Sequence, residues 1–266
     1  MEQHWALITG ASSGIGYQYA RVLANKGYNL IIVSNEEEEI ITKGRLLSQD
    51  FGVDVRPVYM DLATTDAAKQ LFGFCKDNEL QVEILINNAG IFNLGEIVSC
   101  EASRNEKIQI LHMYTPTMLC YYFGQVMKQQ GRGYILNMSS MAAWLPYSGI
   151  GLYAASKRYL KNFSRSLRTE LKDYGVYVTT ICPGAIATDL YHLPRHYQRL
   201  ALRLGIMMTP EKLAAKGIRA LFQHRACILP GTVNYILLPL ARLTPLKLVH
   251  LLMRKSGLLP YTKTEA

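Results

Sequence analysis

Short apolar runs alternate with longer amphipathic stretches along most of the chain. The apolar runs cover residues 5–9, 29–34, 54–59, 83–87, 133–138 and 175–181. Helical patterns lie between them, from the turn after residue 9 to about residue 27 and over 36–49, 65–78, 101–130 and 153–173. A nearly continuous apolar strand is buried on both faces, and intervening helices supply that cover. The sequence therefore predicts an α/β fold: one doubly wound parallel sheet of about seven strands, with helices on both faces and a helical C-terminal extension.

The composition is that of a single compact domain over residues 1–266. Apolar residues make up 49% of the chain and charged residues 18%, which excludes a disordered protein. We see no leader pattern and no run near the roughly 18 apolar residues of a membrane span, so we expect a cytoplasmic protein. No CxxC pattern is present, and no metal site is expected. Five cysteines are interpreted as small buried hydrophobes in a reducing compartment: Cys75, Cys100, Cys120, Cys182 and Cys227.

Positive charge is concentrated in the last quarter of the chain. Residues 191–255 carry eleven basic side chains against one acid, whereas the rest of the chain has 18 basic and 19 acidic residues. A basic face of this kind can meet nucleic acid, an acidic carrier protein or an anionic membrane surface, or it can simply be solvated. No nucleic-acid motif accompanies the charge, so we expect no nucleic-acid partner.

A glycine-rich turn separates the first apolar run from the first helix. It reads Thr9-Gly-Ala-Ser-Ser-Gly-Ile-Gly16, with glycines at positions 10, 14 and 16. Glycines at this point let the backbone turn tightly and approach a pyrophosphate, and the helix N-terminus offers unpaired N–H groups. The turn therefore predicts a dinucleotide site, although its GxxxGxG spacing differs from the commoner GxGxxG.

The sequence resembles the short-chain dehydrogenase/reductase family over residues 5 to 190. The glycine turn is followed, in the family's order, by Asn87-Asn-Ala-Gly90, by Ser139-Ser140, by Tyr153-x-x-x-Lys157 and by Pro183-Gly184. Register carries the resemblance, because the serine at position 140 precedes Tyr153 by thirteen residues and Lys157 follows it by one helical turn. The resemblance implies a Rossmann-type fold and an oxidoreductase that uses a nicotinamide cofactor.

The resemblance also implies three catalytic roles. Tyr153 would be the acid/base that exchanges a proton with the substrate oxygen, and Ser140 would orient that oxygen. An unperturbed tyrosine titrates near 10, and Lys157 would lower that pKa by placing a positive charge beside the phenolate. In the family this lysine also holds the nicotinamide ribose.

His112 departs from the family pattern, which has an asparagine at this place in the central helix. In the family that asparagine holds a water of the proton relay behind the lysine. A ring nitrogen of His112 could hold the same water, the relay could be rearranged, or His112 could be a satisfied core histidine. We include His112 among the candidate catalytic residues.

The cofactor is expected to be NAD(H) or NADP(H), with a preference for NAD(H). Neither the arginine typical of NADP relatives at Asn35 nor the aspartate typical of NAD relatives near Ser34 is present, but Glu36 and the three glutamates after it should repel a 2′-phosphate. By the resemblance Asp61 contacts adenine and Thr188 the carboxamide. The expected cofactor-binding residues are Gly10, Ser12, Ser13, Gly14, Ile15, Gly16, Ser34, Asn35, Asp61, Leu62, Asn88, Ala89, Gly90, Tyr153, Lys157, Pro183, Gly184, Ile186 and Thr188.

Substrate specificity should come from the segments near 189–208 and 231–260, which we expect to form a lid or cap. Pro239 and Pro245 should break the second segment into two short amphipathic helices whose leucines and basic residues suit an apolar substrate or a membrane surface. We expect a bulky, lipid-like or steroid-like ketone or secondary alcohol. A 3-oxoacyl carrier-protein or thioester reductase and a non-catalytic dinucleotide sensor are the alternatives. The family also implies a homo-oligomer, a dimer or tetramer paired through the helices near 101–130 and 153–173.

Overall fold

Seven parallel strands form the central sheet of the computed structural model, which describes residues 4–92, 94–188 and 195–255. The strand order is β3-β2-β1-β4-β5-β6-β9. The sheet confirms the predicted fold class. Its strands are β1 (Trp5–Thr9), β2 (Asn29–Ser34), β3 (Val55–Tyr59), β4 (Val82–Asn87), β5 (Gly133–Met138), β6 (Val176–Ile181) and β9 (Cys227–Ile228).

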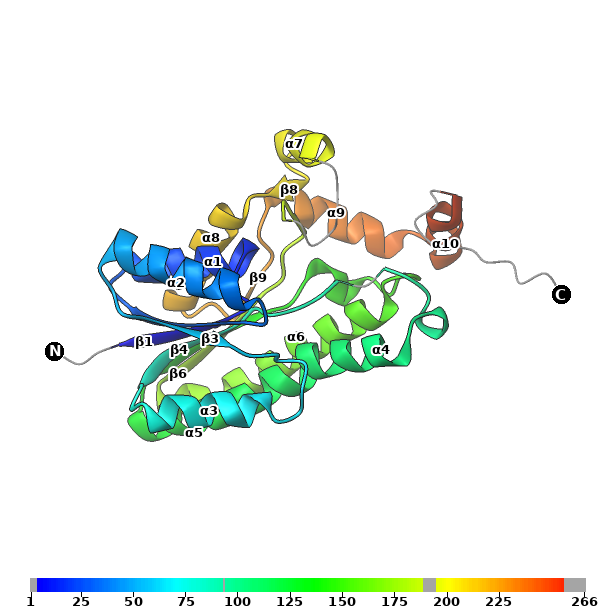
Figure 1. The fold of residues 1–266 in the computed structure, drawn as a ribbon. Helices are drawn as coiled ribbons and strands as arrows, with labels where there is room; N and C mark the ends of the chain where they lie inside the picture. The colour runs from blue at the N-terminus through cyan, green and yellow to red at the C-terminus, as the bar shows by residue number, and fades with distance from the viewer. Residues whose placement is uncertain (1–3, 93, 189–194, 256–266) are drawn as a thin grey trace.

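Helices cover both faces of the sheet and create two apolar cores (Figure 1). On one face lie α1 (Gly14–Ala24), α2 (Glu37–Phe51) and α8 (Pro210–Phe222). The other face is covered by α3 (Ala67–Asp77), α5 (Thr115–Gln130) and α6 (Gly151–Leu171), with α4 (Ala102–Gln109) beside α6. All five side chains of β1 are buried as a result, which is why this strand reads as a continuous apolar run.

The strand order reverses between β1 and β4. One half of the sheet runs outward from β1 through β2 to β3, and the other runs outward from β4 through β5 and β6 to β9. In open α/β sheets a crevice forms at such a switch point, outside the carboxyl ends of the strands. The glycine turn after β1 and the Asn88 segment after β4 meet there.

The helix predicted near 101–130 is confirmed as an uninterrupted helical stretch over 102–130, and it contains one π-helical segment between two α-helices. Helix α4 leads into the π segment η2 (Ile110–Tyr114), which continues into α5. Pro116 has no N–H, so the carbonyl of His112 lacks the donor that an α-helix would supply four residues later. Single π turns of this kind are frequent at functional sites, and His112 lies inside this one.

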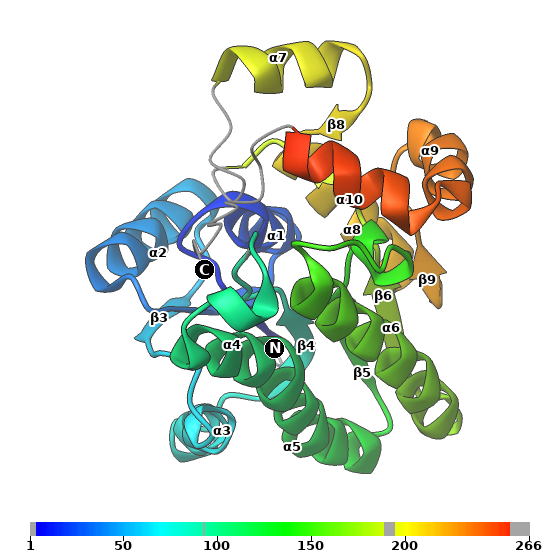
Figure 2. The same cartoon turned by 90° about the vertical axis from the view of Figure 1, so that its right-hand side faces the viewer.

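The C-terminal part forms a group of short elements beyond the sheet. Strands β7 (Ala185–Ile186) and β8 (Met207–Met208) pair with each other, and α7 (Arg195–Arg203), α9 (Thr232–Leu243) and α10 (Leu246–Lys255) gather on one side of the molecule (Figure 2). Three short 3₁₀ segments complete the described elements: η1 (Ile97–Ser99), η3 (Met141–Trp144) and η4 (Lys172–Tyr174). Residues 189–194 and 256–260 of the expected lid lie outside the described residues.

Two short C-terminal helices are present, but only one of the two prolines separates them. Pro239 lies inside α9, whereas the chain bends by 103° between α9 and α10, where Pro245 stands. The residue four before Pro239, Tyr235, is exposed, so water can satisfy the carbonyl that lacks a helical donor. No single helix of the described chain has the length and apolarity of a membrane span; α9 and α10 together reach them only as a bent pair.

The cysteines differ in exposure, so the prediction that all five are buried is wrong. Cys75, Cys120 and Cys182 are buried, Cys100 is partly buried and Cys227 is exposed. All five are free thiols. Among the described residues, histidine, cysteine and acidic side chains form no cluster that could hold a metal ion.

Candidate active site

The glycine turn is held in place by the segment that follows β4. Gly10 and Gly14 adopt positive φ angles of 66° and 53°. The Asn88 side chain donates from Nδ2 to the carbonyls of Thr9 (2.9 Å) and Gly10 (3.1 Å). A Cβ on Gly16 would collide with the Gly10 carbonyl oxygen, so the close approach of turn and helix needs glycine there. The turn is therefore fixed before any ligand arrives.

A cleft of about 590 Å³ opens in front of this turn, a volume in the usual range for cofactor sites. The first turn of α1 faces it with Gly14 and Ile15, and its N-cap residue Ser13 makes no side-chain capping bond. Backbone N–H groups at this helix end thus stay available for an anion. Residues that line the cleft include Gly10, Ser12, Ser13, Gly14, Ile15, Ser34, Asn35, Asp61, Leu62, Asn88, Ala89, Gly90 and Thr188.

The residues of the cleft fit a nicotinamide dinucleotide. Thr188 carries a buried Oγ1 that has no hydrogen-bond partner within the described part of the chain, although Thr188 lies between this cleft and the neighbouring catalytic pocket. A buried hydroxyl without a partner is costly and is explained by a polar ligand group such as a carboxamide. A Cβ on Gly10 would stand 2.9 Å from the Cα of Ala89, so the surface beside the turn is shaped by backbone. These two observations support the predicted binding positions of the cofactor's phosphates, beside the glycine turn, and of its carboxamide, beside Thr188.

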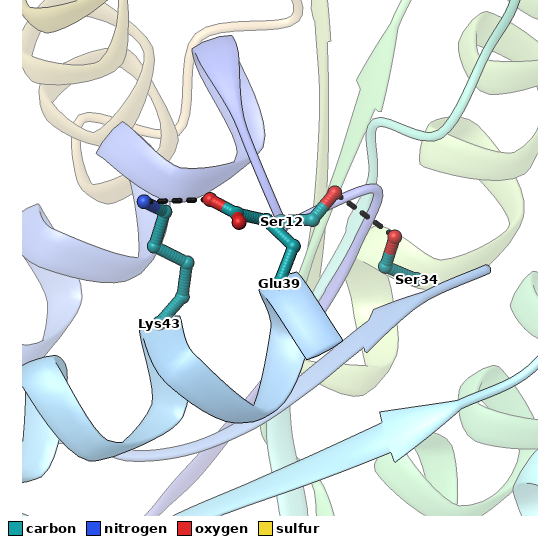
Figure 3. Close-up of polar contacts among 4 residues, drawn as sticks. All are labelled: Ser12, Ser34, Glu39 and Lys43. Carbon is teal, nitrogen blue, oxygen red and sulfur yellow. Dashed lines mark hydrogen bonds and ion pairs between the residues drawn. The ribbon is translucent and has the colours of Figure 1, made fainter. Parts of the chain in front are cut away.

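Neutral and acidic side chains line the cleft near the end of β2. Ser34 donates from Oγ to the Ser12 hydroxyl at 2.9 Å (Figure 3). Its Oγ also accepts the N–H of Glu36 at 3.1 Å. Glu39 is paired with Lys43 at 2.8 Å and is thereby partly neutralised (Figure 3). Glu36 and Asp61 are among the described residues that line this cleft, and no lysine or arginine is among them.

A second, smaller pocket of about 60 Å³ brings the predicted catalytic residues together. Ser140, Tyr153 and Lys157 line it, next to Pro183, Gly184 and Ile186. Ser140 follows the end of β5, caps η3 and accepts the N–H of Ala142 on its Oγ at 3.1 Å. Tyr153 and Lys157 project from the first turns of α6, and both are almost fully buried. The structure thus places these three side chains close together. Their catalytic roles are predictions.

Lys157 is a buried cation held close to Tyr153. Its Nζ donates to the carbonyl of Met138 at 2.9 Å and lies 5.7 Å from the centroid of the Tyr153 ring. Burial lowers the pKa of Lys157 to about 8, because removing the ammonium from water disfavours its charged form. The pKa of this lysine therefore lies within reach of neutral pH, where the environment can tune it for proton transfer.

Both ring nitrogens of His112 are bound within the protein. Nε2 accepts the N–H of Ile91 at 3.0 Å, and Nδ1 is 3.0 Å from the Ser156 hydroxyl. Ser156 donates to the carbonyl of Tyr153 at 2.8 Å, so its oxygen must accept, and the Nδ1 of His112 is the protonated nitrogen. Burial first, and the nearby Lys157 charge second, lower the pKa of His112 well below its usual value. A ring-bound relay water is therefore incompatible with this arrangement.

Two alternatives are compatible with bound ring nitrogens: a rearranged relay and a satisfied core histidine. A cavity of about 10 Å³, enough for about one water, is lined by His112, Pro116 and Lys157. Both ring nitrogens of His112 are already bound, so the ring offers no free nitrogen to a water in this cavity. A positioning role for His112 is a prediction.

Sequence reasoning missed three participants of the site. Ile91 and Ser156 hold the His112 ring, and Met138 holds Lys157 through its carbonyl. For Ser156 a signal existed, since position 156 lies three residues after Tyr153 on the same helix face. Backbone groups such as the Met138 carbonyl leave no trace in residue identity.

Apolar side chains pack around Tyr153. Phe92 stands edge-on to the Tyr153 ring with 5.1 Å between centroids, and Ala142, Ala154 and Ile150 pack into the same cluster.

The segment just before α6 is hydrogen-bonded to the C-terminal helices. Tyr147 donates to the Ala241 carbonyl of α9 at 2.6 Å, and Ser148 is 3.1 Å from the Nδ1 of His250 on α10.

This combination of a dinucleotide cleft and a Ser-Tyr-Lys pocket at the switch point of a parallel sheet defines a nicotinamide-dependent oxidoreductase. The family model of short chain dehydrogenases matches residues 4–197. The chain therefore belongs to the short-chain dehydrogenase/reductase family, whose members oxidise or reduce at CH–OH carbons with NAD(H) or NADP(H).

Curated relatives match about 70% of the chain at low identity. A probable oxidoreductase EphD of Mycobacterium tuberculosis is 31% identical over 193 residues, which are 32% of that protein. Zebrafish (Danio rerio) 17-beta-hydroxysteroid dehydrogenase type 3 is 31% identical over 195 residues, 62% of its length. The zebrafish very-long-chain 3-oxoacyl-CoA reductase-A is 28% identical over 194 residues, 59% of its length. The chain thus spans about a third of the first relative and about three fifths of the other two.

Two solved structures resemble nearly the whole chain. The bulky-bulky ketone specific alcohol dehydrogenase from Comamonas testosteroni is 25% identical with a TM-score of 0.76, covering 98% of this chain and 96% of that one. A short-chain dehydrogenase from Sphingobium yanoikuyae, solved with NADPH, is 26% identical with a TM-score of 0.77 and covers 91% and 93%. The C-terminal group of helices is therefore included in the first of these matches.

Proposed function

We propose that the protein transfers hydride between a nicotinamide cofactor and a bulky apolar ketone or secondary alcohol. The observation that carries this proposal is the convergence of Ser140, Tyr153 and Lys157 on one pocket, with the Tyr153 ring packed in an apolar cluster. A polar reacting centre beside an apolar wall suits a carbonyl attached to a large hydrocarbon body.

Each of the three side chains has a task in the proposed reaction. Ser140 donates to the substrate oxygen and holds it toward Tyr153. Tyr153 gives that oxygen its proton during reduction and takes it back during oxidation. Lys157 stabilises the tyrosinate electrostatically and returns the proton through the water-sized cavity beside His112. The bound nicotinamide supplies or accepts the hydride.

Three comparisons support an apolar substrate. One relative is named for a hydroxysteroid, another for very-long-chain 3-oxoacyl-CoA, and one similar structure for ketones that are bulky on both sides. The structural support is the group formed by α7, α9 and α10, of which α9 and α10 contact Tyr147 and Ser148 just before α6. We assign this group the role of a substrate cap. A short 3-oxoacyl thioester is the alternative substrate, and a non-catalytic sensor the alternative function.

The proposed cofactor preference is NAD(H). Glu36 lines the cleft where a 2′-phosphate would lie, and no lysine or arginine is among the described lining residues to pair with it. Two like charges a few ångströms apart repel, most strongly where water is partly excluded. The similar structure from Sphingobium yanoikuyae was solved with NADPH, so the preference is a property we assign to this chain's own residues.

The C-terminal helices also present a surface that fits an anionic lipid bilayer. Exposed leucines lie along α9 and α10, among them Leu240, Leu243 and Leu251. Arg242, Lys247 and Lys255 are exposed on the same two helices. An apolar surface bordered by cations is the pattern of interfacial helices that rest on anionic membranes. We therefore propose a cytoplasmic protein that contacts a membrane peripherally.

A homo-oligomer is proposed through α5 and α6. Tyr121 on α5 and Tyr159 on α6 are large aromatic side chains left more than two fifths exposed at 52% and 41%. The Tyr159 hydroxyl is 2.9 Å from that of Thr117, which makes the two helices one continuous surface. Aromatic residues are enriched in protein interfaces. Light scattering after gel filtration should give a multiple of the 30.0 kDa chain mass, and a monomer would contradict it.

The proposed function is tested by offering a substrate panel with each cofactor. Nicotinamide absorbance is followed with NADH and NADPH in parallel, against detergent-dispersed 3-keto lipids, keto-steroids and a short 3-oxoacyl thioester. Turnover of a long-chain or steroid ketone, faster with NADH, is the expected result. Reaction of the short thioester alone would overturn the substrate class, and tight cofactor binding without any turnover would favour the sensor.

A further inference from the structure

Cys182 and Cys227 bring two thiols together beside the catalytic pocket. Cys182 directly follows β6, and Cys227 begins the edge strand β9. Their Sγ atoms are 3.7 Å apart although 45 residues separate them along the chain. Backbone hydrogen bonds keep the two strands in register, since the Cys182 N–H donates to the Ile228 carbonyl at 2.9 Å. The pair takes no part in the proposed reaction.

The two thiols differ in a way that suits stepwise oxidation. Cys227 is exposed and can meet a reagent from solution, whereas Cys182 is buried behind it. The hydrogen bond from Cys182 lowers the pKa of the Cys227 thiol, and Lys161 and Arg165 on α6 act in the same direction. An accessible thiol in electropositive surroundings is the reactive kind. A second thiol within a few ångströms can then resolve the first adduct.

We propose that Cys182 and Cys227 form a redox-active dithiol, which a low-molecular-weight disulfide such as oxidised glutathione converts to an intramolecular disulfide with loss of turnover. The Cys227 thiolate attacks one sulfur of the reagent, forming a mixed disulfide and releasing one thiol. The Cys182 sulfur then displaces the second thiol and forms the Cys182–Cys227 bond. The two protons of the protein thiols end on the two released thiols, and the reagent is reduced by two electrons.

The proposed loss of turnover requires that closure of the disulfide displaces the chain at Cys182. The sulfurs have to approach from 3.7 Å to about 2.05 Å. Pro183 and Gly184, the next two residues, line the catalytic pocket, and the Pro183 carbonyl accepts the N–H of Met141, the residue after Ser140, at 2.8 Å. A shift at Cys182 is therefore passed to both walls of the pocket. Misplacement by about 1 Å near reacting groups can cost about 100-fold in rate.

The experiment treats the reduced full-length protein with oxidised glutathione and reads two signals. Peptide mass mapping should show Cys182 linked to Cys227, and ketone turnover should fall about tenfold or more and return after dithiothreitol. A Cys227→Ser variant should keep its activity under the same treatment. Cys100→Ser, a matched change at another accessible cysteine, should respond like the wild type.

Each signal has an outcome that overturns the inference. Two free thiols after treatment, or a lasting glutathione adduct on Cys227, would contradict the proposal that Cys182 and Cys227 form a redox-active dithiol. A mapped disulfide with unchanged turnover would remove its link to the active site. The loss of turnover rests on the proposed function, but the mapping needs no substrate. Failure of the proposed function would show as an inactive reduced enzyme, whichever way the mapping ends.

Discussion

The Nε2 atom of His112 accepts the backbone N–H of Ile91 at 3.0 Å. This bond joins the π segment of the central helix to the loop that follows β4, between the two ligand pockets. The other ring nitrogen reaches Ser156, which in turn holds the Tyr153 carbonyl. The imidazole thus fixes three parts of the active site relative to one another.

Replacing His112 should affect turnover more than cofactor binding. His112→Ala leaves the partly buried N–H of Ile91 without its partner, at a cost of up to about 1–3 kcal/mol in stability, and frees the Tyr153 segment. His112→Asn should retain most activity, because an amide oxygen can accept the same N–H. The measurement is kcat together with the NADH dissociation constant for both variants. Equal losses in both quantities, or no loss in the alanine variant, would remove the positioning role.

Lys157 should make stability depend on pH in the alkaline range. Its pKa in the folded protein is about 8, below the value near 10.4 of an unfolded chain, so the unfolded state binds more protons between these values. Wild-type stability should therefore rise relative to Lys157→Met as the pH increases from about 8 to 10, by up to about 3 kcal/mol. Urea unfolding of both proteins across this range measures the difference. A difference in unfolding free energy that stays constant or shrinks with rising pH would contradict the lowered pKa of Lys157.

A single substitution should shift cofactor preference. Asn35→Arg places a guanidinium in the part of the cleft that holds Glu36 and lacks basic residues among its described lining. A charge-assisted bond contributes about 1.5–3 kcal/mol, so affinity for NADPH should rise about tenfold to a hundredfold. Fluorescence titration with NADPH and NADH measures it, with Asn35→Gln as the uncharged control. An equal gain for both cofactors would place the 2′-phosphate elsewhere.

Anionic vesicles should bind the intact chain through α9 and α10. Each basic residue near such a surface contributes about 1 kcal/mol, so replacing Arg242, Lys247 and Lys255 together with glutamine should lower partitioning about 100-fold. Sedimentation with phosphatidylserine vesicles at low salt measures binding, and added salt should release the wild type. The control changes Lys69, Lys76 and Lys128, which lie on α3 and α5. Equal weakening by both triple variants would show that net charge, and not this surface, controls binding.

The sheet could be predicted closely because its strands are buried on both faces. The apolar runs at 5–9, 29–34 and 133–138 coincide with β1, β2 and β5. The helix near 101–130 was predicted, but its π segment was not, because His112 within it is held by contacts with distant parts of the chain. The expectation that Pro239 breaks a helix was wrong, because Pro239 lies inside α9. An exposed helix tolerates a proline when water replaces the missing backbone N–H donor.

The site was predictable where its residues act through local motifs. Gly10, Ser140 and Tyr153 belong to turns and helix starts whose spacing is visible in sequence, and the structure brings them to adjoining pockets. The neutral tautomer of His112 and the pairing of Cys182 with Cys227 arise from packing between segments far apart in the chain. No spacing rule in a single sequence encodes such contacts.

The most direct test of the account compares the wild type with Tyr153→Phe. The substitution removes one hydroxyl and keeps the ring that packs against Phe92 and His112. With a bulky ketone that the wild type reduces, the account predicts that kcat falls by about 100-fold to 10,000-fold while NADH still binds with nearly unchanged affinity. A variant that retains wild-type turnover would contradict the assignment of Tyr153 as the proton donor, and with it the proposed reaction.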